Sequence, residues 1–245
     1  MQNIENLWDK KAKTYDKFDG NLSEFQIKFF EILSKFGVDF KDKTLIDIGC
    51  GTGIYSLYLA KNCKFVLGVD SSKEMLKELE NSAKTQNITN IKTIFSNFEN
   101  FKSKDKFDIA FLTMSPALQN ENDFEKFANL ANFRIFMNWE KPRNSTLLTP
   151  FFEKFGVKNR EKKLNSTANL LNFLKDKNIP FQSEILNEIR HSKRDFNDAF
   201  ANVLWHLKIN NFSYNEDEIK KMLKLRFKND FIEDKVEICV RIIVF

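Results

Sequence analysis

Residues 45–53 read Leu45-Ile46-Asp47-Ile48-Gly49-Cys50-Gly51-Thr52-Gly53, the pattern of a buried strand that ends in a glycine turn before a helix. The whole chain has only 7 glycines, and this turn contains Gly49, Gly51 and Gly53. Glycine is required where the backbone takes a positive φ or where a ligand approaches the main chain closely. We therefore expect a ligand site at this turn.

Apolar segments of strand type recur up to about residue 140, and a helical pattern follows each of them. Their starts lie 16 to 27 residues apart, which is the spacing of βαβ units. Such units build a parallel sheet with helices on both faces. The expected strands are residues 45–48, 65–69, 91–95, 107–112 and 134–139.

Further helices and strands are indicated by capping residues and periodicity. Ser71 and Glu74 have the spacing of a capping box for the helix after the second strand. Apolar residues recur at helical spacing from Asp195 onward, and acids precede bases between about residues 216 and 228, as the helix dipole favours. Two further strands are expected, at residues 181–189 and 236–245.

An acidic residue on the next strand accompanies the glycine turn. Asp70 ends that strand, 17 residues after Gly53. Ligands of open α/β sheets bind beyond the carboxyl ends of the strands, and a carboxylate there can accept hydrogen bonds from both hydroxyls of a ribose. The sequence thus predicts a cofactor that contains a nucleoside.

The details of the turn distinguish among nucleoside cofactors. A P-loop for ATP requires Gly-Lys-Ser/Thr, which is absent. The dinucleotide pattern G-x-G-x-x-G fails at Ile54 when it is read from Gly49. Read from Gly51 it meets Ser56, a weak match that leaves a nicotinamide cofactor as an alternative. Asp47 before the turn favours a ligand that carries a cation, and S-adenosylmethionine carries an ammonium, a sulfonium and a ribose.

Two motifs resemble those of the class I S-adenosylmethionine-dependent methyltransferases. The first is Asp47-Ile48-Gly49-Cys50-Gly51-Thr52-Gly53, and the second is Gly68-Val69-Asp70-Ser71-Ser72. The fourth-strand segment Phe107-Asp108-Ile109-Ala110-Phe111 also fits, so the resemblance covers most of residues 1–140. Trp8-Asp9, Ala12 and Tyr15-Asp16 are similar to the leading helix of many small-molecule members, which folds over the cofactor.

The resemblance implies a fold and a domain layout. The expected fold is α/β, a Rossmann-like, doubly wound, mostly parallel seven-stranded sheet with a C-terminal antiparallel strand and helical additions. We expect a single domain over residues 1–245. In it, residues 1–140 form the cofactor-binding core, about 144–228 add helices that bind or cover the acceptor, and 236–245 form the terminal strand.

The resemblance also implies roles for the matching residues. The glycines would pass beneath the methionine half of the cofactor, with Asp47 near its amino group. Asp70 would hold the ribose hydroxyls, Ser71 would lie near the adenine, and Asn97 stands where the family often has an aspartate that accepts from the adenine amino group. The residues expected to bind S-adenosylmethionine or its product S-adenosylhomocysteine are Tyr15, Asp47, Gly49, Cys50, Gly51, Gly53, Asp70, Ser71, Asn97, Phe98 and Thr113.

The end of the fourth strand, which faces the acceptor in this family, reads Thr113-Met114-Ser115-Pro116-Ala117. It is not the Asn/Asp-Pro-Pro-Tyr/Phe motif of adenine and glutamine amino methyltransferases, and it lacks the Pro-Cys used on pyrimidine carbon 5. These absences favour a small molecule, with or without an anionic group, as the methyl acceptor. The sequence does not identify the catalytic residue. The candidates are Tyr15, Ser115, Arg143 for an anionic group, and His191 as a base.

Charge leaves other acceptors open. The formal net charge is +5, and residues 141–163 contain seven Lys or Arg against two Glu. A basic segment can bind phosphates, so an RNA or protein methyltransferase is an alternative, although nucleic acid is the less favoured partner. A non-catalytic cofactor-binding protein is another.

Composition narrows the class of protein. With 42% apolar and 30% charged residues among 245, the chain is of the globular type, and no apolar segment approaches the ~18–20 residues of a membrane span. Residues 1–17 mix acids and lysines, unlike a signal peptide, so we expect a cytoplasmic protein without a membrane partner. Three widely spaced cysteines and two histidines predict neither a disulfide framework nor a metal site. The oligomeric state is not indicated.

Overall fold

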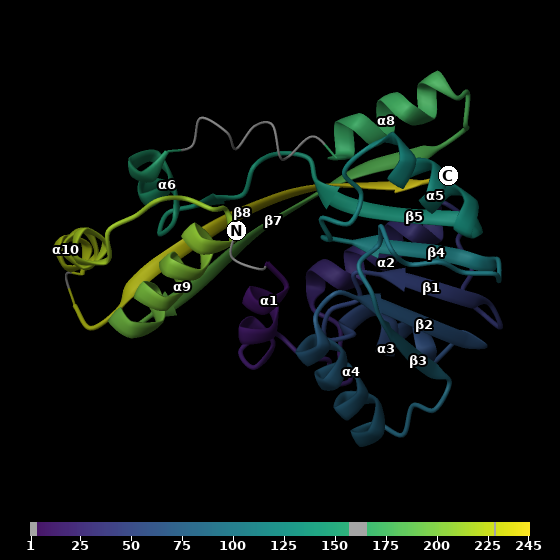
Figure 1. The fold of residues 1–245 in the computed structure, drawn as a ribbon, viewed down its shortest axis with the longest axis horizontal. Helices are drawn as coiled ribbons and strands as arrows, with labels where there is room; N and C mark the ends of the chain where they lie inside the picture. Colours follow the sequence, from purple (N-terminus) through teal and green to yellow (C-terminus); the bar gives the residue numbers. More distant parts are fainter. Residues whose placement is uncertain (1–3, 157–165, 228) are drawn as a thin grey trace. The chain divides into compact units, whose positions relative to one another are not determined.

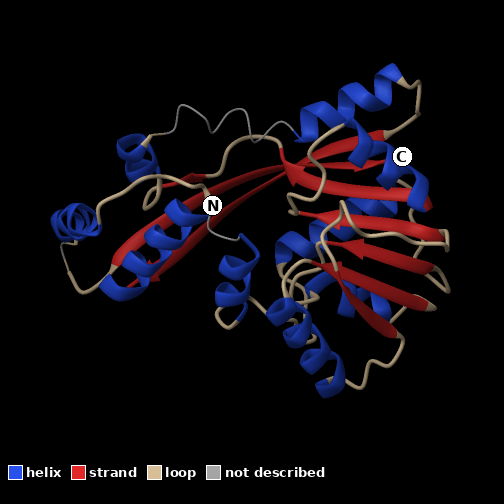
Figure 2. Ribbon diagram, in the orientation of Figure 1, coloured by secondary structure: helices blue, strands red, loops and turns tan. Residues whose placement is uncertain are grey.

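The apolar segments of the sequence become the strands of one mixed sheet. In the computed structural model, which describes residues 4–156, 166–227 and 229–245, the sheet has eight strands in the order β3-β2-β1-β4-β5-β8-β6, and β7 pairs with β8 (Figure 1, Figure 2). The strands are β1 (Thr44–Ile48), β2 (Phe65–Asp70), β3 (Ile91–Phe95), β4 (Phe107–Thr113), β5 (Ala131–Trp139), β6 (Asn144–Ser145), β7 (Gln182–Arg194) and β8 (Ile232–Val244).

Helices α1 and α2 precede the first strand, and the other described helices lie between strands. They are α1 (Ile4–Ala12), α2 (Glu24–Lys35), α3 (Ile54–Ala60), α4 (Lys73–Thr85), α5 (Glu121–Leu130), α6 (Thr149–Phe155), α8 (Ser166–Asp176), α9 (Phe196–Ile209) and α10 (Glu216–Arg226). None of the helices within the described ranges has both the length and the apolar character that a bilayer crossing requires.

The predicted fold class is confirmed. Strands β1 to β5 pair in parallel. Arg134 and Phe245 exchange two backbone hydrogen bonds, of 3.0 and 3.1 Å, which is the pattern of an antiparallel pair. The sheet has eight strands where seven were expected, and the two-residue β6, antiparallel to β8, is too short to leave a pattern in the sequence.

Helices cover both faces of the parallel part of the sheet. On one face, Ile46 and Ile48 of β1 pack in a core with residues of α5 and α8. On the other face, the ring of Phe111 of β4 meets Phe29 of α2 and Tyr55 of α3, at centroid distances of 5.9 and 5.7 Å. Successive strand residues point to opposite faces, so a strand buried on both sides reads as the continuous apolar run that marks it in the sequence.

The capping prediction for α4 is wrong by one residue. Ser72 is the N-cap, and its Oγ accepts from the N–H of Met75 at 3.2 Å. Ser71 and Glu74 have the capping-box spacing, but Asp70 accepts a hydrogen bond from the N–H of Ser72. That bond fixes the turn so that Ser72 rather than Ser71 starts the helix.

The chain packs as two compact units. Unit 1 comprises Met1–Asn138, Ser166–Leu186 and Arg241–Phe245, and unit 2 comprises Trp139–Asn165 and Asn187–Val240. Unit 1 contains the parallel strands and the glycine turn. Unit 2 has its own apolar core, in which residues of α6, α9 and α10 pack together.

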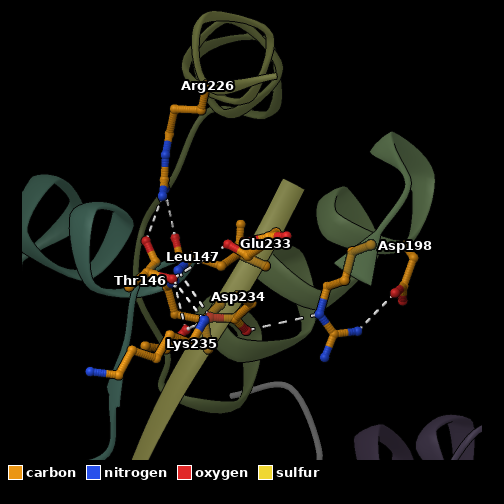
Figure 3. A network of polar contacts seen from close by, with 10 residues as sticks. Thr146, Leu147, Asp198, Arg226, Glu233, Asp234 and Lys235 are labelled. Atoms are coloured by element: carbon orange, nitrogen blue, oxygen red, sulfur yellow. Dashed lines mark hydrogen bonds and ion pairs between the residues drawn. The ribbon is translucent and has the colours of Figure 1, made fainter. Parts of the chain in front are cut away.

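A buried carboxylate organises the polar interior of unit 2 (Figure 3). Oδ1 of Asp234 accepts from Ser145 Oγ at 2.7 Å and from the N–H of Leu147 at 3.1 Å. Arg226 donates to the carbonyls of Thr146 and Leu147, and Nε of Arg194 lies 3.9 Å from Oδ2 of Asp234. These contacts fasten the segment before α6 to β8 and to the end of α10.

Candidate functional site

The glycine turn between β1 and α3 has the backbone that its composition predicts. Gly49, Gly51 and Gly53 have φ values of +73°, +54° and +82°, a region that other residues adopt only with strain. A Cβ on Gly51 would meet no atom within 4 Å, whereas a Cβ on Gly49 would overlap the side chain of Ser115. The main chain is therefore open to a ligand at Gly51 and closely approached by β4 at Gly49.

Cys50 contributes its backbone to the turn. Its N–H donates to the carbonyl of Val69 at 3.2 Å, and its Sγ lies over Gly68, where a Cβ would come within 2.9 Å. Burial, reinforced by the charges of Asp70 and Asp47, raises the pKa of the Cys50 thiol well above its ordinary value. The thiol stays protonated and packs against the sheet.

Asp70 is held rigidly at the carboxyl end of β2. Its Oδ2 accepts from the N–H of Gly51 and its Oδ1 from the N–H of Ser72, both at 2.8 Å. Desolvation raises the pKa of Asp70. The backbone hydrogen bonds lower this pKa and the nearby charge of Asp9 raises it, each by less than desolvation does. Each carboxylate oxygen uses one lone pair in these bonds and keeps another. The carboxylate can thus accept from two ligand hydroxyls.

Asp47 lies beneath the turn, with 2% of its surface exposed. Its Oδ2 accepts from Oγ of Ser56 in α3 at 2.5 Å, and Ser56 is fully buried. Desolvation raises the pKa of Asp47 to about 7, against the lowering effect of the Ser56 bond and with a further increase from the charge of Asp70. The carboxylate of Asp47 is therefore shielded from solvent and bonded to α3.

The residues expected near the adenine lie at the ends of β2 and β3. Ser71 is partly buried beside Asp70. Asn97 follows β3, and its Oδ1 accepts from the N–H of Asn100 at 2.9 Å, which leaves one lone pair on that oxygen. The Phe98 ring is buried in the core of unit 1, so Phe98 offers a ligand its backbone.

The end of β4 is tied to β5 and pressed against the glycine turn. The N–H of Met114 donates to the carbonyl of Met137 at 2.7 Å, although Met114 has a φ of +53°. Asn138 is buried, and its Nδ2 donates to the carbonyl of Ser115 at 2.9 Å. The other described non-glycine residues with positive φ are Asp or Asn, which tolerate this region. A methionine held there is strained, as is common beside functional sites.

Asn138 was missed in the sequence, although a signal existed. Thr113, the last residue of β4, pairs with Met137 in the parallel register, so the next residue of β5 must lie at the same edge as Ser115. A polar residue directly after a buried apolar run marks such a position.

The leading segment lies in unit 1 beside α4 (Figure 1). The rings of Trp8 and Tyr15 meet edge to face at 6.1 Å, and Tyr15 is 38% exposed. Oγ1 of Thr52, in the glycine turn, donates to the carbonyl of Asp16 at 2.6 Å. The structure thus brings Tyr15 to the neighbourhood of the turn.

Arg143 and His191 belong to unit 2. Arg143 is partly buried, and His191 is exposed on β7. Their roles in binding an anionic group and as a base stay predictions. Over the residues that the structure describes, no three His, Cys, Asp or Glu side chains are grouped so that they could hold a metal ion.

The basic segment 141–163 is only partly described. Lys158, Arg160, Lys162 and Lys163 lie outside the described residues. Lys154 forms an exposed ion pair with Glu218 at 2.9 Å.

Comparisons with known proteins point to methyltransferases. Residues 45–132 match the family model described as a methyltransferase domain. Over 124 residues the chain is 29% identical to the "Probable cobalt-precorrin-6B C(15)-methyltransferase (decarboxylating)" of Methanococcus maripaludis, a match that covers 51% of this chain and 67% of that one. Over 43 residues it is 58% identical to protein arginine N-methyltransferase 1 of Saccharomyces cerevisiae, covering 16% of this chain and 12% of that one.

A solved structure shares the fold over nearly the whole chain. Precorrin 8W decarboxylase of Methanobacterium thermoautotrophicum superposes with a TM-score of 0.51 at 14% identity, over 95% of this chain and 96% of that one. At this identity the likeness establishes the fold alone.

Proposed function

Because the chain belongs to the class I S-adenosylmethionine-dependent methyltransferases, we propose that it transfers the methyl group to a small molecule. The observation that carries the proposal is the turn at the end of β4. Its residues Thr113, Met114, Ser115 and Pro116 are uncharged, and Ser115 lies against Gly49 in the cofactor turn. Such a turn offers a hydroxyl and an apolar side chain to an acceptor.

The residues of unit 1 fit the cofactor. Gly51 leaves the main chain open, and Asp70 keeps acceptor capacity for two ribose hydroxyls after binding the N–H groups of Gly51 and Ser72. The buried Asp47 favours a ligand with positive charge over the turn. A nicotinamide dinucleotide fits less well, because Ser56, the residue in place of the third glycine, is fully buried and donates to Asp47.

The extent of the matches supports a small acceptor. The match to the cobalt-precorrin enzyme, whose name specifies a small-molecule acceptor, covers 67% of that protein. The match to the protein arginine methyltransferase is confined to 43 residues and 12% of that protein. A match over so small a part of that protein says little about the acceptor.

Methyl transfer in this protein would depend mainly on positioning. S-adenosylmethionine supplies a methyl group on an activated sulfonium leaving group. The chain's own part is to hold the ribose at Asp70, to place the methionine half over Gly51, and to present the acceptor at the β4 turn. Holding two reactants in line supplies a large share of such a reaction's rate enhancement. Arg143 is our candidate for binding a carboxylate or phosphate of the acceptor.

The acceptor class can be tested with S-adenosylmethionine labelled in its methyl group. The purified protein is incubated with a cell extract, and the extract is then divided into a filtrate of small molecules, RNA and protein. After chromatography has removed unreacted S-adenosylmethionine, we expect a new labelled compound in the filtrate with the wild type, and not with the Asp70→Ala variant or with extract alone. Label that remains with RNA or protein would contradict the proposal and favour the macromolecular alternative.

A further inference from the structure

The leading helix contacts the start of α4 through one carboxylate. Oδ1 of Asp9 in α1 accepts from Oγ of Ser72 at 2.6 Å and from the N–H of Glu74 at 3.2 Å. The first N–H groups of a helix have no partner within the helix. Asp9 therefore caps α4 from a distant part of the chain, together with the N-cap Ser72.

Ser72 also contacts the carboxylate that we expect to bind the ribose. The N–H of Ser72 donates to Oδ1 of Asp70 at 2.8 Å, and Ser72 is fully buried. A single residue thus receives Asp9 on its hydroxyl and holds Asp70 with its backbone. The direction of the Asp70 carboxylate depends on where Ser72 lies, and the position of Ser72 depends on Asp9.

The other end of the leading segment is anchored independently. The carbonyl of Asp16 accepts from Thr52, a buried residue of the glycine turn. Phe18 is 4% exposed and packs with Leu57 and Leu79. Losing the Asp9 contact should therefore loosen α1, which is otherwise held by the buried Leu7 and Ala12, while the segment from Asp16 to Phe18 stays in place.

We propose that Asp9 is a positioning residue for Asp70. By fixing Ser72 and the first turn of α4, it holds the Asp70 carboxylate in the direction that accepts ribose hydroxyls, and it links the docking of α1 to cofactor binding. The inference rests on the cofactor of the proposed function and is independent of the acceptor. Because coupling between two binding events is reciprocal, bound cofactor must in turn hold α1 more firmly.

Variants at Asp9 separate the hydrogen bonds from the charge. Asp9→Ala removes the acceptor oxygen, whereas Asp9→Asn keeps an acceptor oxygen and removes the charge. Asp16→Asn is the matched control, since it removes a charge from the same segment and Asp16 bonds Thr52 through its main chain. Asp9→Glu, which keeps the charge and displaces the oxygens by one methylene, serves if the alanine variant does not fold.

Two measurements test whether the Asp9 contact affects cofactor binding, and one of them needs no ligand. Isothermal titration gives the Kd for S-adenosylhomocysteine, and hydrogen exchange of the unliganded protein follows the amides of α1 and of the first turn of α4. We expect Asp9→Ala to weaken binding about tenfold, equivalent to about 1.4 kcal/mol, and to speed exchange in both places. Asp9→Glu should also weaken binding, and Asp9→Asn and Asp16→Asn should stay within about threefold of the wild type.

Wild-type affinity in Asp9→Ala or Asp9→Glu would overturn the inference. So would an Asp9→Asn variant as weak as Asp9→Ala, because charge rather than the hydrogen bonds would then be responsible. If the wild type itself bound no S-adenosylhomocysteine, the cofactor assignment would fail. The exchange data on the unliganded protein would still decide whether Asp9 holds the first turn of α4.

Discussion

Replacing Asp47 by asparagine should make the protein increasingly more stable than the wild type as the pH rises. Asp47 is 2% exposed, and Ser56 donates to its carboxylate. Burial raises the pKa of Asp47 from 3.8 to about 7. Asparagine presents an oxygen to Ser56 in the same place and carries no charge at any pH.

The size of the effect follows from the shift in the pKa. Between about pH 4 and 7, the raised pKa keeps Asp47 protonated in the folded protein, whereas the same carboxyl is ionised in the unfolded chain. The free energy of unfolding therefore falls as the pH rises through that window. The shift of about three pKa units, at 1.36 kcal/mol each, amounts to about 4 kcal/mol above pH 7. About 3 kcal/mol of this is lost between pH 5 and 8.

Urea unfolding followed by circular dichroism at pH 5, 6, 7 and 8 measures the difference. The free energy of unfolding of Asp47→Asn minus that of the wild type should increase by about 3 kcal/mol over this range. Asp108→Asn is the matched control. Bonds from the N–H and hydroxyl of Thr44 lower the pKa of Asp108, so it stays ionised throughout and its difference should be flat. A flat difference for Asp47→Asn as well would refute the reasoning.

Three further substitutions probe the turns around the site. Gly49→Ala should abolish binding of S-adenosylhomocysteine in a calorimetric titration, because its Cβ would overlap Ser115; binding at wild-type strength would show that the turn can rearrange. Gly53→Ala should lower the free energy of unfolding by about 2 kcal/mol or more, because φ is +82° and the new Cβ would lie 2.5 Å from Leu79 Cγ; a loss below about 0.5 kcal/mol in urea unfolding would count against this packing. Met114→Gly should raise the melting temperature, by the equivalent of about 1 kcal/mol, because glycine adopts a φ of +53° without strain. A lower melting temperature would mean that the contacts of the Met114 side chain contribute more free energy than the backbone strain costs.

The parallel part of the fold is readable from sequence because its strands are short apolar runs. Strands β1, β2 and β4 are largely buried, whereas β3 has no buried residue. The expected strand at residues 91–95 coincides with β3, and the strand expected at 107–112 gains only Thr113. The strand expected at 134–139 begins three residues earlier, at Ala131, because α5 ends at Leu130 with no intervening loop. An apolar run locates a strand, but it does not show where a helix gives way to it directly.

The later strands were less predictable because one of them is largely exposed. The strand expected at 181–189 is β7, which continues to Arg194. Along β7 only Leu186 is buried, so polar residues such as His191 and Lys193 conceal its length. The helix expected from Asp195 starts at Phe196, with Asp195 as its N-cap.

The residues of the site were predictable where the backbone itself requires them. Gly49, Gly51 and Gly53 have positive φ values, and the carboxylate of Asp70 lies beside the turn. The contacts that position those residues come from distant parts of the chain. Asp9 reaches Ser72 across 63 positions, and no local pattern encodes such a pair.

The central claim is most directly tested by a thermal-shift comparison of S-adenosylmethionine, S-adenosylhomocysteine, NAD and no ligand, with Asp70→Ala beside the wild type. A ligand at about 100 times its Kd adds about 2.7 kcal/mol to the folded state, or about 5–10 °C in the melting temperature of a chain of this size. We predict this shift with both adenosyl compounds, none with NAD, and its loss in Asp70→Ala. A shift with NAD alone, or with none of the ligands, would contradict the account.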